Sequence, residues 1–151
     1  MKKFLLLLSL SALVIAGCSR PKTGDVSQPV KIIFDTDLGP DYDDVGALAF
    51  LHAMAASGKA EILATLSSNK HELVAPSIDV INTWFNRPDL PVGAPAGNGP
   101  DLGSSQHWAD SIVAAYPHDI KSTSEAEDAV RIYRKILAGQ PDKSVTLITG
   151  G

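Results

Sequence analysis

The stretch that decides the fold is Val30-Lys31-Ile32-Ile33-Phe34 running directly into Asp35-Thr36-Asp37-Leu38-Gly39-Pro40-Asp41-Tyr42-Asp43-Asp44. The first five residues form a short β-branched and aromatic run, which predicts a buried strand. The residues after Asp43 carry apolar side chains at helical spacing as far as Ser57, and Gly58 is a suitable stop. The sequence therefore predicts a strand, an aspartate-rich loop and a helix in direct succession.

Outward from this unit, strands and helices alternate along the chain. Strands are expected at 60–66, 90–92 and 144–148, and helices at 72–85, 106–115 and 125–138, the last one capped by Ser124. This order predicts an α/β fold, a Rossmann-like open and mostly parallel sheet with helices on both faces. Ligands bind such sheets outside the carboxyl ends of the strands. We therefore expect the loops 35–44, 67–71 and 149–151 to face one crevice.

The N-terminus has the pattern of an export signal. Lys2 and Lys3 precede an uncharged apolar run, and the ending Val14-Ile15-Ala16-Gly17-Cys18 resembles the lipobox of bacterial lipoproteins. The resemblance implies cleavage before Cys18 and acylation of that residue, which would anchor an exported protein to the membrane on the periplasmic side or at the outer membrane. Ordinary secretory cleavage is the alternative. The predicted organisation is a signal peptide at 1–17, a lipidated cysteine with a polar tether at 18–29, and one domain at 30–151.

Charge and cysteine content argue against a nucleic-acid partner and against a disulfide within the chain. The signal removes two of the 13 basic residues and none of the 17 acidic ones, so the remaining chain carries a formal charge of 11 − 17 = −6. A nucleic-acid partner would require a basic surface, so none is expected. Cys18 is the only cysteine, so no disulfide can form within the chain.

The aspartate loop holds five carboxylates within ten residues. Repulsion at this density is costly unless a cation neutralises it or some carboxylates keep their protons. An oxygen-ligated divalent cation is the simplest solution, Ca²⁺ in a flexible site and Mg²⁺ in an octahedral one. A helix-capping loop with solvated acids is the plainer alternative. An EF-hand loop is excluded, because its twelfth position would be Gly46 rather than a bidentate Glu.

A strand followed by Asp-x-Asp-x-Gly and then by Asp-Asp at a helix start resembles the nucleoside hydrolases of the inosine–uridine type. Asn69, the segment 90–95 and the strand with its glycine turn at 145–151 match the family more weakly. The resemblance implies a metal-dependent hydrolase of N-glycosidic bonds in ribonucleosides, with Ca²⁺ as the expected cofactor and Mg²⁺ as the less favoured one. The resemblance implies that Asp37 is a cation ligand and the general base, and that Asp44 and the Thr149 carbonyl are further cation ligands. It also implies that Asp43 and Asn69 contact the ribose and that Asp35 and Gly39 support the loop.

This sequence departs from the family in two ways. The spacing after the glycine is longer than usual, so either Asp41 or Asp43 meets the ribose, and Leu38 stands where the family has Pro or Thr. Family members are also about twice as long, and their second half carries another metal-ligating Asp, further sugar contacts and often a His that protonates the leaving base. We therefore expect an N-terminal part of the domain that binds metal weakly and is inactive alone.

Two other functions stay open at this point. A haloacid dehalogenase-type phosphatase also has Asp-x-Asp after a strand, here Asp35 and Asp37, with Ser67 or Ser68 as the phosphate-binding hydroxyl. A lipid-anchored protein that captures nucleosides or sugars without turnover is the non-enzymatic alternative. His71 lies near the crevice, where a capping role is favoured over a catalytic one. The sequence leaves open whether the chain forms a homo-oligomer.

Overall fold

The computed structural model describes residues 28–150 as an α/β fold with a five-stranded, all-parallel open sheet. The strand order is β4-β3-β2-β1-β5, so the first strand lies inside the sheet and the last one at its edge. The strands are β1 (Val30–Thr36), β2 (Ala60–Ser67), β3 (Val92–Ala94), β4 (Glu127–Asp128) and β5 (Val145–Thr149). The helices are α1 (Asp43–Ala56), α2 (Val74–Trp84), α3 (Trp108–Ala115) and α4 (Ala129–Ala138).

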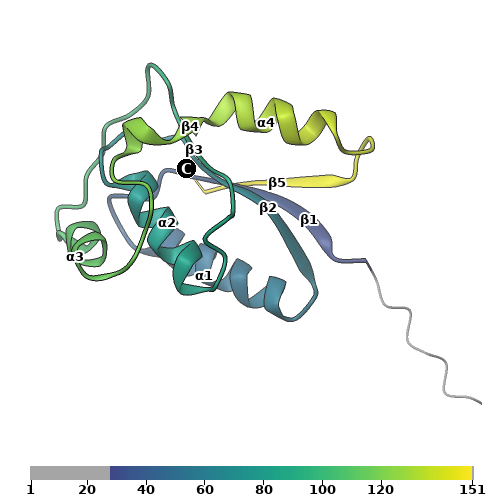
Figure 1. Cartoon of the computed structure of the whole chain (residues 1–151), viewed down its shortest axis with the longest axis horizontal. Helices are drawn as coiled ribbons and strands as arrows, with labels where there is room; N and C mark the ends of the chain where they lie inside the picture. Colours follow the sequence, from purple (N-terminus) through teal and green to yellow (C-terminus); the bar gives the residue numbers. More distant parts are fainter. Residues whose placement is uncertain (1–27, 151) are drawn as a thin grey trace, which may run out of the picture.

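Helices cover both faces of this sheet, as predicted (Figure 1). Even-numbered residues of β1, such as Phe34, face α1 and α2 and join the larger hydrophobic core with Leu48 and Ile78. Odd-numbered residues, such as Ile33, face α4 and form a smaller core with Ile132. The alternation follows from the pleat of a strand, which points successive side chains to opposite faces.

Close packing of α4 explains a glycine in β3. A Cβ at Gly93 would lie 2.8 Å from Cδ1 of Ile132, 2.9 Å from Cδ2 of Leu66 and 3.0 Å from Cα of Ala129. The absence of a side chain at this position therefore lets α4 approach the sheet closely enough to bury Ile132.

One helix begins later than predicted. The sequence placed its start at Glu125 with Ser124 as the cap, but Thr123–Glu125 form a short 3-10 turn and Glu127–Asp128 pair with β3. The helix cap is Asp128, whose Oδ1 accepts a hydrogen bond from the Val130 amide at 3.0 Å. Pairing with a strand distant in sequence therefore overrides the local capping pattern.

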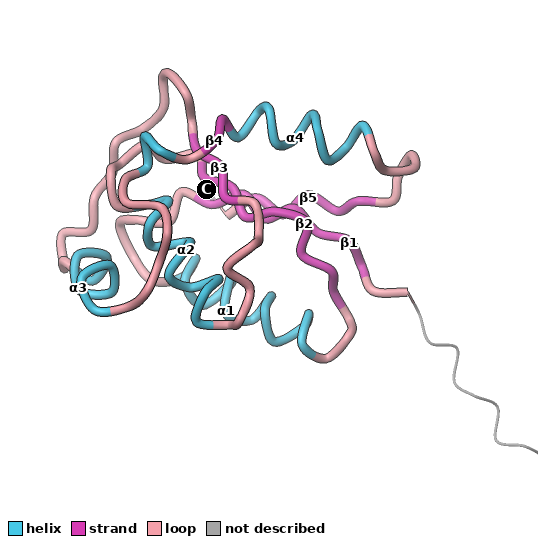
Figure 2. The backbone as a smooth tube through the Cα atoms, in the orientation of Figure 1, coloured by secondary structure: helices cyan, strands magenta, loops and turns pink. Residues whose placement is uncertain are grey.

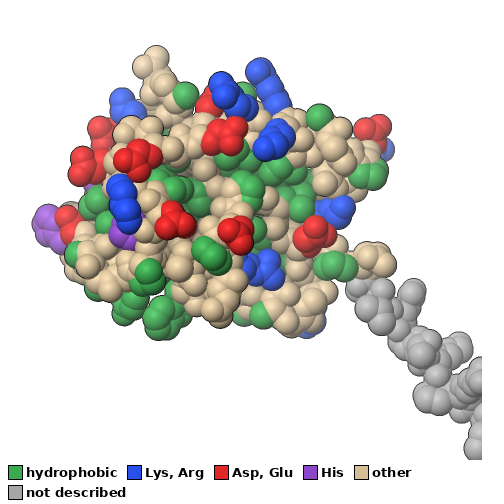
Figure 3. All heavy atoms as spheres, viewed as in Figure 1, with side chains coloured by type: hydrophobic (Ala, Val, Ile, Leu, Met, Phe, Trp, Pro, Cys, Tyr) green, Lys and Arg blue, Asp and Glu red, His purple; other side chains and the backbone are tan. Residues whose placement is uncertain are grey.

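The strands β1, β2 and β5 run parallel, so their carboxyl ends lie at the same edge of the sheet, where the loops that the sequence singled out follow them. Figure 2 distinguishes the loops from the strands and helices by colour. Acidic, basic and hydrophobic side chains alternate over the face that Figure 3 shows.

None of the helices within 28–150 is both long and apolar enough to cross a bilayer. The predicted signal peptide, Cys18, most of the tether and Gly151 lie outside the described residues.

Candidate functional site at the carboxyl edge of the sheet

The centre of the candidate site is a pair of aspartates, Asp37 and Asp44. Asp37 follows β1, and Asp44 stands in the first turn of α1. Their side chains are hydrogen-bonded to each other, and Asp44 is only 4% exposed. Burial, followed by the hydrogen bond with Asp37, raises the pKa of Asp44 to about 7, while a hydrogen bond with Thr36 acts in the opposite direction. Near neutral pH the Asp44 carboxyl therefore gains and loses its proton readily, and a cation could take the place of that proton.

The end of β5 closes over this pair. The Gly150 amide donates to the Asp35 carbonyl at 2.8 Å, which holds the turn after Thr149 against the end of β1. A Cβ at Gly150 would collide with Oδ1 of Asp44. The backbone at 149–150 thus passes directly beside the buried carboxylate, and a side chain at position 150 would displace it.

A second carboxylate pair, Asp41 and Asp43, lies on the outside of the loop. Both side chains are exposed and hydrogen-bonded to each other. The hydrogen bond with Asp43 is the main cause that raises the pKa of Asp41, and the same bond lowers the pKa of Asp43. The loop therefore presents one partly buried pair, Asp37 and Asp44, and one solvent-facing pair, which the sequence alone did not distinguish.

Asn69 is placed at the same edge, but its side chain is already fully engaged. Its amide donates to the carbonyls of Asp37 at 2.9 Å and Leu102 at 2.8 Å, and its Oδ1 accepts from the amides of His71 at 3.0 Å and Leu102 at 3.1 Å. Asn69 is 0% exposed. In this arrangement it ties three loops together rather than presenting its amide to a ligand.

Gly39 packs against the Asn69 side chain and the Leu102 carbonyl. A Cβ there would lie 2.5 Å from the Leu102 carbonyl oxygen and 2.9 Å from Nδ2 of Asn69. The family resemblance implied a loop-supporting role for Gly39, and its backbone is not in the left-handed region. Close approach of the 102 loop, not backbone freedom, is the reason for a glycine at this position.

Asp35 points away from the other aspartates, toward α4. Its Oδ2 accepts a hydrogen bond from the hydroxyl of Tyr133 at 2.8 Å. Burial is the first cause that raises the pKa of the Tyr133 phenol, and the bond to Asp35 adds to it. Asp35 therefore braces β1 against α4 through Tyr133, a partner that the sequence analysis missed because nothing near Tyr133 marks it.

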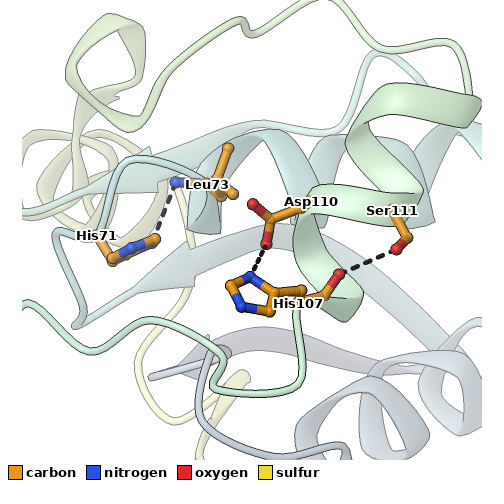
Figure 4. A network of polar contacts seen from close by, with 5 residues as sticks. All are labelled: His71, Leu73, His107, Asp110 and Ser111. Carbon is orange, nitrogen blue, oxygen red and sulfur yellow. Dashed lines mark hydrogen bonds and ion pairs between the residues drawn. The ribbon is translucent and has the colours of Figure 1, made fainter.

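The serines and histidines at this edge have structural partners. Ser67 Oγ donates to the Asn69 carbonyl at 2.9 Å. Nδ1 of His71 faces the Leu73 amide at 3.4 Å just before α2 (Figure 4). A Cβ at Gly103 would lie 2.6 Å from Nε2 of His71. His107 is exposed and pairs with Asp110 at 3.5 Å. His71 thus lies where a cap of α2 would be, beside the loop at Gly103.

Within residues 28–150, no three His, Cys, Asp or Glu side chains come together in an arrangement that would hold a metal ion. The donors that the fold does bring together are the Asp37 and Asp44 carboxylates and the neighbouring backbone at 149–150. No protein-family model and no curated protein sequence matches the chain. Function is therefore inferred from the geometry of the site.

Proposed function

We propose that the loop 35–44 forms the cation- and ribose-binding wall of a hydrolase that cleaves the N-glycosidic bond of ribonucleosides, giving free base and ribose. The observation that carries the proposal is the contact between Asp37 and the buried Asp44 beneath the turn at Gly150. A buried carboxyl whose pKa is raised to about 7 beside a second carboxylate is a site where a cation can replace a proton.

The donor set fits Ca²⁺ better than Mg²⁺. Asp37, Asp44 and the Thr149 carbonyl would hold the ion, with substrate hydroxyls and water as the remaining ligands. Such an irregular set of oxygen donors suits Ca²⁺, whereas Mg²⁺ requires near-octahedral geometry. When bound, the ion would neutralise the paired carboxylates and lower the pKa of a neighbouring water.

The remaining roles follow from exposure. Asp37 is less buried than Asp44, so its carboxylate is the one placed to accept a proton from the attacking water. The exposed Asp41 and Asp43 can accept hydrogen bonds from the ribose hydroxyls and stabilise positive charge that develops on the sugar. Asn69 would act indirectly, by fixing the Asp37 carbonyl.

The geometry disfavours the phosphatase alternative. That chemistry needs both carboxylates of the Asp-x-Asp pair at the reacting phosphate. Here Asp35 is bonded to Tyr133 on the α4 side, whereas Asp37 is bonded to Asp44 at the start of α1. The hydroxyl of Ser67 is also buried and occupied.

Calcium and ribose binding to the purified chain test the proposal. A bound ligand at about 100 times its dissociation constant stabilises a folded protein by about 2.7 kcal/mol. We expect excess Ca²⁺ to raise the melting temperature, and ribonucleosides to raise it further than 2′-deoxyribonucleosides do. Asp44→Asn should abolish both effects, and Asp89→Asn, an exposed aspartate before β3, should keep them.

Assays of released product identify the reaction. Free base or reducing sugar would support the N-glycosidase, and phosphate released from a generic ester would support the phosphatase. Cation and ribose binding without released base would match the capture protein or the incomplete, inactive domain that the sequence predicts. If neither Ca²⁺ nor ribonucleosides changed the melting temperature, the proposal that the loop 35–44 binds a cation and ribose would be contradicted.

We also propose that the chain is exported and anchored through Cys18, on the strength of the lipobox pattern. Metabolic labelling with a radioactive fatty acid should label the wild-type chain and leave Cys18→Ser unlabelled. Equal labelling of the two would exclude acylation at Cys18.

A further inference from the structure

The outward side of α4 carries a stripe of basic side chains. Arg131, Arg134 and Lys135 are exposed and lie three and four positions apart, so they share one side of the helix. Tyr133 and Ile136, which pack against the smaller core, lie on the opposite side. The basic stripe of Arg131, Arg134 and Lys135 therefore points away from the sheet.

The positive charge of this stripe is not balanced locally. The α4 helix contains no acidic residue between Ala129 and Ala138. Within residues 28–150 the ion pair that the structure contains joins His107 and Asp110 at the start of α3, so no cation of the stripe is paired with a carboxylate there. The whole chain has a formal charge of −4. A patch of free positive charge on such a chain favours an anionic partner.

Two exposed aliphatic side chains flank the stripe. Val130 is 52% exposed and Leu137 is 39% exposed, and because they lie 137 − 130 = 7 positions apart, they share one side of α4. At a bilayer surface, aliphatic side chains beside cations bury apolar area at the boundary between headgroups and acyl chains. A lipid surface therefore uses both features of α4, whereas a nucleic acid would use only the charge.

The end of α4 lies beside the start of β1, where the predicted tether joins the domain. Lys31 in β1 donates a hydrogen bond from Nζ to Oε1 of Gln140, which follows α4, at 2.8 Å. Gln28, the first described residue, follows Cys18 by 28 − 18 = 10 residues, a length that spans at most about 35 Å. The ten residues of α4 extend over about 15 Å. A lipid on Cys18 would therefore hold the whole of α4 within reach of the membrane surface.

The exposed acids of the aspartate loop lie at the other end of the sheet. Asp41 and Asp43 belong to the loop after β1, at the carboxyl edge, whereas the contact between Lys31 and Gln140 places the end of α4 at the amino edge. An anionic surface would attract the stripe and repel this loop. The two effects favour one orientation, in which α4 faces the surface and the loop 35–44 faces the aqueous side.

We propose that the basic stripe of α4 docks the domain on the anionic headgroups of the membrane to which Cys18 is attached. This docking rests on the proposed anchoring at Cys18 and does not depend on the proposed hydrolase. Lysines and arginines bind an anionic leaflet through their charge, and three of them raise the affinity roughly a hundredfold. Because the tether already keeps the domain near the surface, an attraction of this size is enough to hold it there.

Chemical coupling at Cys18 tests the docking separately from acylation in cells. Cys18 is the only cysteine, so a maleimide-bearing phospholipid attaches the full chain at that thiol alone. The vesicles are made of phosphatidylcholine, with or without phosphatidylglycerol as the anionic lipid. Brief acetylation with acetic anhydride, followed by mass spectrometry, measures how accessible each lysine is. We expect Lys135 to react about tenfold more slowly on the anionic vesicles, and Lys70, exposed at the carboxyl edge, to react equally on both.

Removal of the two arginines tests whether α4 is the docking side. Arg131→Gln combined with Arg134→Gln keeps good helix formers and should restore the reactivity of Lys135 on anionic vesicles, as should high salt, which screens the attraction. Lys121→Gln, which removes an exposed cation outside α4, should keep Lys135 protected. Circular dichroism verifies that each variant is folded. Equal reactivity of Lys135 on both kinds of vesicle, or protection that persists without the two arginines, would overturn the proposal.

Discussion

Removing the side chain of Asn69 should cost more stability than any other single polar change at the carboxyl edge. The amide makes four hydrogen bonds, to the backbone of Asp37, His71 and Leu102, and is 0% exposed. Asn69→Ala removes all four at once. It leaves two backbone carbonyls and two backbone amides to find new partners.

The size of the loss follows from the number and setting of these bonds. Each intramolecular hydrogen bond contributes about 0.5–1.5 kcal/mol net, and an unsatisfied buried group costs about 1–3 kcal/mol. Leu102 is 45% exposed, so water can reach part of the vacated space and limit the penalty. We therefore expect a decrease in the free energy of unfolding of roughly 3–4 kcal/mol. Asn69→Asp should be at least as harmful, because a carboxylate oxygen would then face the carbonyls of Asp37 and Leu102.

Urea unfolding of the purified chain measures this loss through the transition midpoint at constant slope. Asn98→Ala is the matched control, since Asn98 is an exposed asparagine in the loop after β3. That variant should remain within about 0.5 kcal/mol of the wild type. A loss below about 1 kcal/mol for Asn69→Ala would refute the view that this amide holds the three loops together.

Three further changes have outcomes that the structure fixes in sign. Burial, the largest cause, lowers the pKa of His52 below 6.5, so the unfolded chain binds the proton more readily than the folded one. The contribution of His52 to stability is therefore complete above about pH 6.5 and is lost as the pH falls. Urea unfolding at several pH values should show a smaller decrease in the free energy of unfolding at acid pH for His52→Gln than for the wild type. Tyr133→Phe should lose about 1–2 kcal/mol in the same urea assay because Asp35 loses its donor, while Tyr116→Phe, at a 43% exposed tyrosine, should not change. Gly93→Ala should destabilise by about 1–3 kcal/mol through collision with α4, whereas Gly46→Ala, an exposed position in α1 with open space around it, should stabilise by about 0.5–1 kcal/mol; thermal melts that shifted in the same direction for both would contradict this packing.

The unit of β1, loop and α1 could be predicted because its signals are local. A β-branched run, a turn-forming loop and helical spacing all lie within 28 residues of sequence, from Val30 to Ser57. The alternation of elements then implied the parallel sheet, which the structure confirms. The start of α4 was misjudged because the pairing of Glu127–Asp128 with β3 depends on a strand far away in sequence.

Partners of the site residues were beyond the reach of sequence reasoning for the same reason. The hydrogen bond between Tyr133 and Asp35 spans 98 positions, and the bonds between Asn69 and Leu102 span 33. Sequence proximity grouped all five aspartates into one cluster. The pleat of β1 turns Asp35 toward α4, and the start of α1 buries Asp44, so only the fold separates them into a brace, a buried pair and an exposed pair.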